Sequence, residues 1–360
     1  MLTAVLSDLH VGAVTKQSVA TDPRSLEILA ERLAGADRVV LLGDVLELRE
    51  APLGEVLAAS EPLFRTIGAA VGGGRVTIVP GNHDHHLAAP VLDDRRLGMN
   101  GSLPVETVVP APPHGPAGRM AEWLGPAELE LAYPGLWLRP DVFATHGHYL
   151  DLHNTVPTLE CLGVSAVERA LGGAPAGGRT PEDYEAALAP IYALTFSLAQ
   201  AGRRSRRLTG GASAAIWART GGSDGSPSLS GRILAGAAIP AAVAAVNRAG
   251  LGPFRPDLSG TALRTAGLAA MAEVAERLAG SAPHVLFGHT HRSGPWPGDD
   301  AGEWSLAGGG RLVNTGSWVM DDAFAPTGGG VNPYSPGTCV FLEGDAPPRL
   351  ERLLPPGAPT

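Results

Sequence analysis

The chain has 360 residues, 44% of them hydrophobic, and a formal net charge of −9. This length and apolar content allow one large globular domain or two smaller ones with a substantial core. The acidic balance disfavours a protein that coats nucleic acid, because such proteins usually carry a basic face. Two cysteines, Cys161 and Cys339, fit no zinc motif and are too few for a disulfide framework, so a reducing, cytoplasmic setting is expected.

The first 90 residues are predicted to alternate strands and helices. Runs of apolar residues predict buried strands at Thr3–Leu6, Arg38–Leu42 and Arg75–Val79. Apolar positions near helical spacing predict helices at Ser25–Leu33 and Glu55–Val71. The pattern is that of a β-α-β-α-β unit.

The next segment is predicted to be less regular. A short helix is expected to end at about Leu97, and the Pro- and Gly-rich stretch Gly98–Gly118 is expected to be a loop. Alternation over Glu128–Leu138 predicts a pair of hairpin strands with a turn near Pro134. This pair leads into a strand at Asp141–Ala144.

Residues 155–283 are predicted to form an all-helical insertion, with residues 1–154 and 284–360 as the main domain. The expected helices are Leu159–Leu171, Pro181–Gln200, Ala212–Arg219, Gly231–Ala249 and Thr261–Leu278. The insertion leaves and rejoins the chain beside the polar motifs described next, so it is expected to cap them. The alternative is a helical layer that only packs on the sheet or forms a dimer. Strands are expected again at His284–Phe287, Arg311–Asn314 and Thr338–Leu342.

Five polar motifs each follow one of the predicted strands. They are Asp8-Leu9-His10, Gly43-Asp44, Gly81-Asn82-His83-Asp84, His146-Gly147-His148 and Gly288-His289-Thr290-His291. Open α/β sheets present their chemistry at the carboxyl ends of strands, where loops gather. Imidazole, carboxylate and amide oxygen together suit Mn²⁺, Fe or Zn²⁺. Two such ions roughly 3.5–4 Å apart can hold a bridging hydroxide and clamp an in-line displacement at phosphorus.

The order of these motifs resembles that of the calcineurin-like metallophosphoesterase superfamily. The resemblance implies a four-layer α/β/β/α sandwich and two divalent ions, Mn²⁺ in the first place and Fe or Zn²⁺ as alternatives. One ion would be held by Asp8, His10, Asp44 and His291, and the other by Asp44, Asn82, His146 and His289. His83 would act on the phosphate as general acid or charge stabiliser, and Asp84 would orient it.

Three polar residues near the fourth motif are further candidates. His148, Asp151 and Asn154 could contact substrate or support the metal ligands, although His148 could equally be a solvated loop residue.

The substrate is less defined than the chemistry. The motifs, the helical insertion and a late Asn314-Thr315-Gly316-Ser317-Trp318 are similar to those of UDP-2,3-diacylglucosamine pyrophosphatases. That branch typically has Arg in place of His83 and Asp in place of His148. The expected activity is therefore hydrolysis of a phosphodiester or pyrophosphate bond in a phosphorylated small molecule or lipid-linked substrate. The alternatives are a nucleotide or nucleic-acid phosphodiesterase or nuclease, and a non-catalytic metal-binding scaffold.

No stable nucleic-acid partner is expected, and the oligomeric state is open. The sequence shows no signal peptide and no uninterrupted apolar stretch of spanning length, so a cytoplasmic protein is expected. The basic run Arg203–Arg207 inside the insertion leaves a peripheral membrane contact open.

Overall fold

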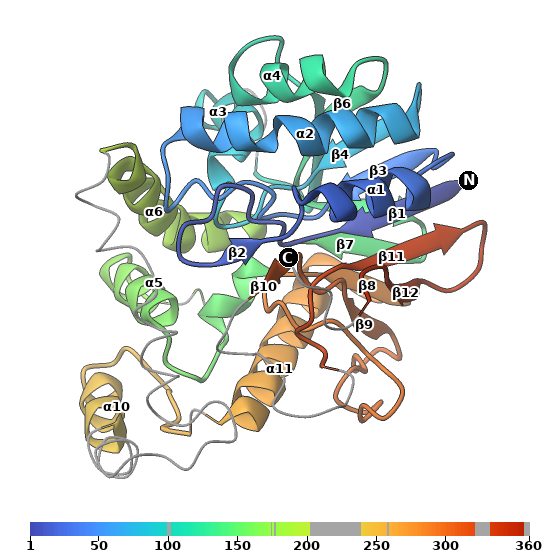
Figure 1. Ribbon diagram of the computed structural model, residues 1–360. Helices are drawn as coiled ribbons and strands as arrows, with labels where there is room; N and C mark the ends of the chain where they lie inside the picture. Colours follow the sequence, from blue (N-terminus) through green and yellow to red (C-terminus); the bar gives the residue numbers. More distant parts are fainter. Residues whose placement is uncertain are drawn as a thin grey trace.

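The computed structural model describes residues 1–98, 102–173, 175, 178–201, 239–257, 259–320 and 332–355 (Figure 1). The expected helix Ala212–Arg219, the first part of the expected helix Gly231–Ala249 and the basic run Arg203–Arg207 lie outside these residues.

One large mixed sheet forms the centre of the molecule. Its strand order is β12-β11-β1-β3-β4-β6-β7-β8-β9, with β5 paired to β6. The strands are β1 (Leu2–Leu6), β3 (Arg38–Leu41), β4 (Arg75–Ile78), β5 (Glu106–Pro110), β6 (Glu128–Arg139), β7 (Val142–Thr145), β8 (His284–Phe287), β9 (Arg311–Asn314), β11 (Thr338–Glu343) and β12 (Arg349–Arg352). A separate two-stranded ladder joins β2 (Gln17–Ser18) to β10 (Val319–Met320).

Strand β6 links two parallel groups of strands. Its first residues pair in parallel with β4, and its later residues pair antiparallel with β7. Strands β1, β3 and β4 are parallel to one another, and so are β7, β8 and β9. The prediction of a β-α-β-α-β start is confirmed, with α1 (Pro23–Arg32) and α2 (Leu53–Val71) between these strands.

Two predictions for the middle of the chain are wrong. The stretch Gly98–Gly118, expected to be a loop, contains β5 and the start of α4 (Gly115–Leu124), whose apolar face is buried despite the nearby prolines. The expected hairpin within Glu128–Leu138 is instead the single strand β6. Pro134 lies at a register shift opposite the beginning of β5, so the strand accommodates it without turning.

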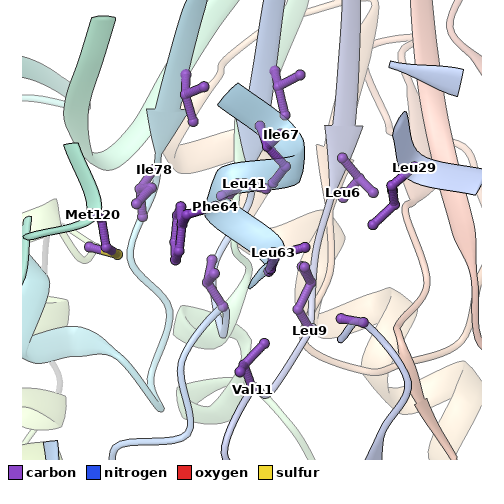
Figure 2. Packing of buried hydrophobic residues seen from close by; sticks show 14 of the residues in the cluster. Leu6, Leu9, Val11, Leu29, Leu41, Leu63, Phe64, Ile67, Ile78 and Met120 are labelled. Carbon is purple, nitrogen blue, oxygen red and sulfur yellow. The ribbon is translucent and has the colours of Figure 1, made fainter. Parts of the chain in front are cut away.

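Apolar side chains cover the sheet on both faces. Leu6, Leu41 and Ile78 pack against Phe64 and Ile67 of α2 (Figure 2). Neighbouring residues in the same strands point the other way, since side chains alternate along a strand. Together with residues of β7, β8, β9 and β11, they form a second cluster that joins the two parallel groups: Val5, Val40, Val142, Leu286, Val313 and Val340. The four-layer arrangement expected from the sequence stays a prediction.

The described part of residues 155–283 contains only helices and their links. The helices are α5 (Leu159–Ala170), α6 (Pro181–Gln200), α10 (Ile239–Arg248) and α11 (Gly260–Leu278). Helix α6 begins where predicted because the side chains of Thr180 and Asp183 form a capping box. Helix α11 lies on the side of the sheet away from α2 and packs against β7 and β8 (Figure 1). No helix among the described residues is long and apolar enough to cross a bilayer.

A buried carboxylate fixes α6 to the main domain. Glu185 accepts hydrogen bonds from the hydroxyls of Tyr133 in β6 and Tyr149 (2.9 Å), and its Oε2 lies 2.9 Å from Nε2 of His85. Burial alone would raise the pKa of Glu185, but the charge of His85 and these hydrogen bonds hold it below its ordinary value. Tyr149 belongs to the short helix η2 (His148–Leu152) and His85 to η1 (His85–Ala88), which directly follow two of the polar motifs.

We expect Glu185→Ala to lower the free energy of unfolding in urea by about 3–5 kcal/mol, because it leaves buried polar partners uncompensated. Glu61→Ala, which removes an exposed ion pair on α2, is the control and should change it by less than about 0.5 kcal/mol. Equal effects of the two substitutions would show that Glu185 is not a structural anchor.

Candidate metal centre

The ends of the central strands bring the polar motifs together in strained backbone conformations. Five non-glycine residues of the described chain have positive φ angles: Asp8 (53°), His10 (45°), Asp44 (51°), His289 (65°) and His291 (58°). All five were predicted to be metal ligands. Left-handed backbone at residues other than glycine is uncommon, costs about 1–3 kcal/mol for each residue, and clusters at functional sites. The fold therefore holds these side chains in place although the strained backbone at each of them costs free energy.

The glycines of three motifs are required by close approach of the neighbouring side chains. A Cβ atom at any of them would collide with another candidate ligand. The contacts would be Gly43 with Nδ1 of His146 at 2.2 Å, Gly81 with Oδ1 of Asp44 at 2.3 Å, and Gly288 with Oδ2 of Asp8 at 2.3 Å. Only glycine gives the backbone this proximity.

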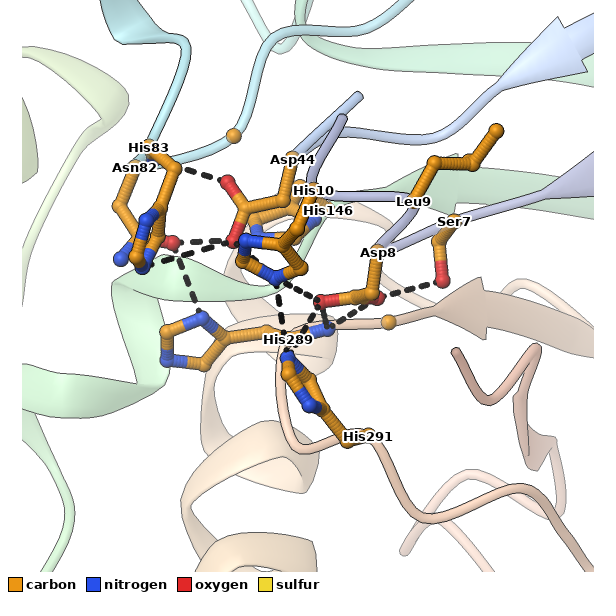
Figure 3. Close-up of polar contacts among 12 residues, drawn as sticks. Ser7, Asp8, Leu9, His10, Asp44, Asn82, His83, His146, His289 and His291 are labelled. Atoms are coloured by element: carbon orange, nitrogen blue, oxygen red, sulfur yellow. Dashed lines mark hydrogen bonds and ion pairs between the residues drawn. The ribbon is translucent and has the colours of Figure 1, made fainter. Parts of the chain in front are cut away.

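The candidate ligands form three overlapping groups in which all ligand atoms lie within 4.8 Å of one another. The groups are Asp8, His10 and His291; His10, Asp44 and His83; and Asp44, His146 and His289. Nε2 of His10 lies 3.1 Å from Nε2 of His291, and Oδ2 of Asp44 lies 3.6 Å from Nε2 of His10 and 3.3 Å from Nε2 of His146 (Figure 3). Asp44 is thus shared between the two ligand sets that the sequence predicts.

The side chain of Asn82 supports a cation in the second set. Its amide oxygen lies 3.2 Å from Nε2 of His146 and 3.1 Å from Nδ1 of His289, and Oδ2 of Asp44 is 3.2 Å away. Hydrogen bonding alone would favour the reversed amide, whose NH₂ group could donate to all three atoms and whose oxygen could accept from Arg49. With the oxygen pointing inwards, four electron-pair donors converge, as the ligands of a metal ion do.

The remaining ring nitrogens of three histidines have fixed partners. Nδ1 of His10 lies 2.9 Å from Oε2 of Glu47, Nδ1 of His146 lies 2.9 Å from the carbonyl oxygen of Leu42, and Nε2 of His289 lies 3.1 Å from Oδ1 of Asp151. A metal-binding histidine typically donates its other N–H to a carboxylate or carbonyl, which fixes its tautomer and orientation. The residues present therefore fit a pair of divalent cations.

Charge interactions within the centre are strong. Burial opposes ionisation of Asp44, but its charge interactions with His146 and His83 hold its pKa well below the ordinary value. Burial would lower the pKa of His146, but Asp44 raises it to about 10. Burial lowers the pKa of His10 to about 4. The proton on His146 thus balances Asp44 at a position where a bound cation would displace it.

The structure corrects the role expected for Asp84. Its carboxylate accepts from the backbone N–H groups of Gly81 (2.7 Å) and Val45 (2.8 Å), so it braces the loop that carries Asp44. It is not hydrogen-bonded to the ring of His83. Burial and the negative charge of Asp44 raise the pKa of Asp84 to about 6.

Glu47 instead orients His83, a role that the sequence analysis missed. Oε1 of Glu47 lies 2.7 Å from Nδ1 of His83, while Oε2 binds His10, and the glutamate is only 1% exposed. One carboxylate therefore fixes both a candidate ligand and the residue beside it. The available signal in the sequence was an acidic residue three positions after Asp44.

The three further candidates have different surroundings. Asp151 supports His289 and lines the cleft at the centre. Asn154 lines the same cleft, and its Oδ1 accepts from the backbone of Val156. His148 is buried, does not line this cleft, and lies 3.2 Å from the hydroxyl of Tyr133 through its Nε2. Neither substrate contact by His148 nor the solvated alternative agrees with this position.

The cleft beside the centre has a volume of about 250 Å³ and is built partly from residues 155–283. These contribute Thr158, Glu160, Leu263, Arg264, Gly267 and Leu268. The remaining wall includes Lys16, Asn82, His83, Leu150, Asp151, Asn154, Phe287, Thr290, Arg292, Trp304 and Tyr334.

Comparisons with known proteins give little further information. No protein-family model matches the chain, and no curated protein matches it. Among solved structures, a dimetal phosphatase from Danio rerio aligns with 97% of this chain and 98% of its own at 11% sequence identity. The TM-score of 0.34 does not establish a shared fold.

We expect EDTA to lower the thermal unfolding midpoint and Mn²⁺ to restore it, because a ligand that binds only the folded state stabilises it. Asp44→Asn should largely abolish this response and reduce the metal content measured by elemental analysis. A midpoint that is unchanged by EDTA in a protein shown to contain metal before treatment would contradict this prediction.

We expect Glu47→Gln to weaken metal binding about 10–100-fold, the usual loss when the partner of a metal-binding histidine is changed. Titration with Mn²⁺ followed by calorimetry measures the effect. The control is Glu27→Gln at an exposed position of α1, which should bind metal like the parent protein. Unchanged affinity in Glu47→Gln would exclude a supporting role for Glu47.

Proposed function

We propose that this protein is a binuclear metal-dependent phosphoesterase that hydrolyses a phosphodiester or pyrophosphate bond. The observation that carries the proposal is the meeting of seven candidate ligands from five strand ends, with five of them held at positive φ. The first ligand set is Asp8, His10, Asp44 and His291, and the second is Asp44, Asn82, His146 and His289. Such strain is retained where function requires the geometry.

When bound, two cations supply a water of lowered pKa and positive charge for the phosphoryl oxygens. The donor set contains no thiolate, which favours Mn²⁺, with Fe or Zn²⁺ as alternatives. Asp44 sits between both ligand sets, so it would keep the two cations at a fixed separation.

His83 is placed to move a proton at the leaving oxygen. Its Nδ1 is held by Glu47, which leaves Nε2 on the side of Asp44 (4.0 Å) and Arg49 (3.4 Å). Burial lowers the pKa of His83 to about 3, and Nε2 is the ring nitrogen that would carry the proton for the leaving oxygen. The guanidinium of Arg49 adds positive charge for the phosphoryl group beside it.

Residues 155–283 are proposed to form a helical insertion that caps the cleft within a four-layer α/β/β/α fold. Support comes from Glu160 near the start of α5, which forms an ion pair of 3.2 Å with Arg49, and from Leu263 and Leu268 of α11 in the cleft wall. The proposed substrate is a phosphorylated small molecule or lipid-linked compound. A cytoplasmic location, the absence of a stable nucleic-acid partner and a membrane contact through this segment stay predictions.

A substrate panel tests the function. Protein loaded with Mn²⁺ and shown by elemental analysis to hold two ions should hydrolyse bis-p-nitrophenyl phosphate faster than p-nitrophenyl phosphate. Pyrophosphate diesters, dinucleotides and single-stranded DNA complete the panel, and preference for the last two would favour the nuclease alternative. Two bound metal ions without turnover of any substrate would reject the enzyme and favour the scaffold.

We expect His83→Ala to keep both metals but to lower kcat by about 10²–10⁴-fold, the usual contribution of acid–base catalysis. His86→Ala is the matched control, because His86 stacks on Phe196 and does not line the cleft. Its kcat should stay close to that of the parent. Loss of metal in His83→Ala would make His83 a ligand instead, as its grouping with His10 and Asp44 allows.

A further inference from the structure

Three lysine or arginine side chains line the cleft, and two of them are neutralised by a carboxylate. Arg264 pairs with Glu303 at 3.0 Å and Arg292 with Asp299 at 2.5 Å. Lys16 makes no hydrogen bond or ion pair with any described residue, although it lines the same cleft as Asp44, His83 and His291. Its positive charge is therefore available to a bound molecule.

The backbone before Lys16 is fixed. The carboxylate of Glu50 accepts from the N–H groups of Val14 and Thr15, each at 2.9 Å, and from the hydroxyl of Thr15. Gln17 and Ser18 then pair with β10. Lys16 thus projects from a segment held on both sides, and the carboxylate of Glu50 is occupied by these hydrogen bonds.

Lys16 lies on the catalytic side of the cleft. It lines this cleft together with His83 and with the candidate ligands Asp44 and His291. One ammonium group therefore shares the cleft with both the proposed proton carrier and a candidate ligand of the first set.

We propose that Lys16 is a specificity-determining residue that binds a second anionic group of the substrate, next to the phosphoryl group under attack. This inference rests on the proposed function. A phosphodiester carries one negative charge, which the two cations would balance. An ammonium on a flexible stem binds a further phosphate oxygen as a point charge. The substrate class favoured is a pyrophosphate diester over a simple phosphodiester.

The apolar part of the cleft is consistent with an organic group attached to this diphosphate. Leu263, Leu268, Phe287 and Trp304 contribute to the lining. Aryl esters are therefore suitable probes. Their aryl groups can contact this apolar surface in an ester of one phosphate and in an ester of two.

Kinetics on two matched esters test the proposal. For P¹,P²-diphenyl pyrophosphate, Lys16→Met should raise KM roughly 10–100-fold, as expected for loss of a hydrogen bond to a charged group. For bis-p-nitrophenyl phosphate, KM should change less than about twofold, and kcat on both esters should be retained. Lys16→Arg should restore most of the affinity for the pyrophosphate. Arg24→Met, at an exposed position of α1, controls for loss of one positive charge. Equal effects of Lys16→Met on both esters, or no effect, would overturn the proposal.

Chemical modification of Lys16 tests the proposal without any measurement of turnover. Lys16 is the only lysine of the chain, so an amine-acetylating reagent reports on this side chain and the N-terminus alone. With metal-loaded protein, saturating diphenyl methylenediphosphonate should slow acetylation of Lys16 at least about 10-fold by mass spectrometry, whereas diphenyl phosphate should slow it less than twofold. The N-terminal amine serves as internal control. Equal protection by both compounds, or by neither, would refute the role of Lys16. If neither ester were hydrolysed by the parent protein, the proposed function would fail while this experiment still tested Lys16.

Discussion

The structure depends on bringing several electron-pair donors together in a buried space. Asp8 and Asp44 are fully buried, and burial by itself favours their neutral forms. They stay ionised because imidazole groups lie a few ångströms away. The negative charge of these buried carboxylates must be balanced by positive charge, which either protons or cations can supply. The left-handed backbone at the ligands adds a local cost that two bound ions would offset.

The rest of the fold supplies the rigidity that such a site needs. The candidate ligands follow strands whose last residues are almost completely buried, such as Leu6, Leu41 and Phe287. Asp84 secures the loop of Asp44 through backbone hydrogen bonds, and Glu47 joins His10 to His83. These acidic residues therefore have distinct roles, because Asp44 is shared between the ligand sets while Asp84 and Glu47 position what surrounds it.

The clustering of the candidate ligands could be predicted from the sequence because each of them directly follows a predicted strand. A polar residue directly after a buried strand lies at the carboxyl end of that strand. The two parallel groups run in opposite directions, and their carboxyl ends meet because β4 pairs with the first part of β6 and β7 with its later part. The partner of His83 was mispredicted because adjacency along the chain does not determine the direction of a side chain. Asp84 points into its own loop, whereas Glu47 reaches His83 from another strand end. Strand β6 was mispredicted because Pro134 is normally read as a turn signal, and only its place opposite the start of β5 shows that the strand continues.

The distribution of the ligands along the chain has a consequence for biosynthesis. The first set needs both Asp8 and His291, and the second needs both Asp44 and His289. Neither set is complete until synthesis has passed the last of the five motifs. Strands β1, β3 and β4 are made long before, and at that stage Asp8 and Asp44 have His10 and His83 near them but lack His146, His289 and His291. Capture of both ions would then be a late event in maturation, after β8 has joined β7.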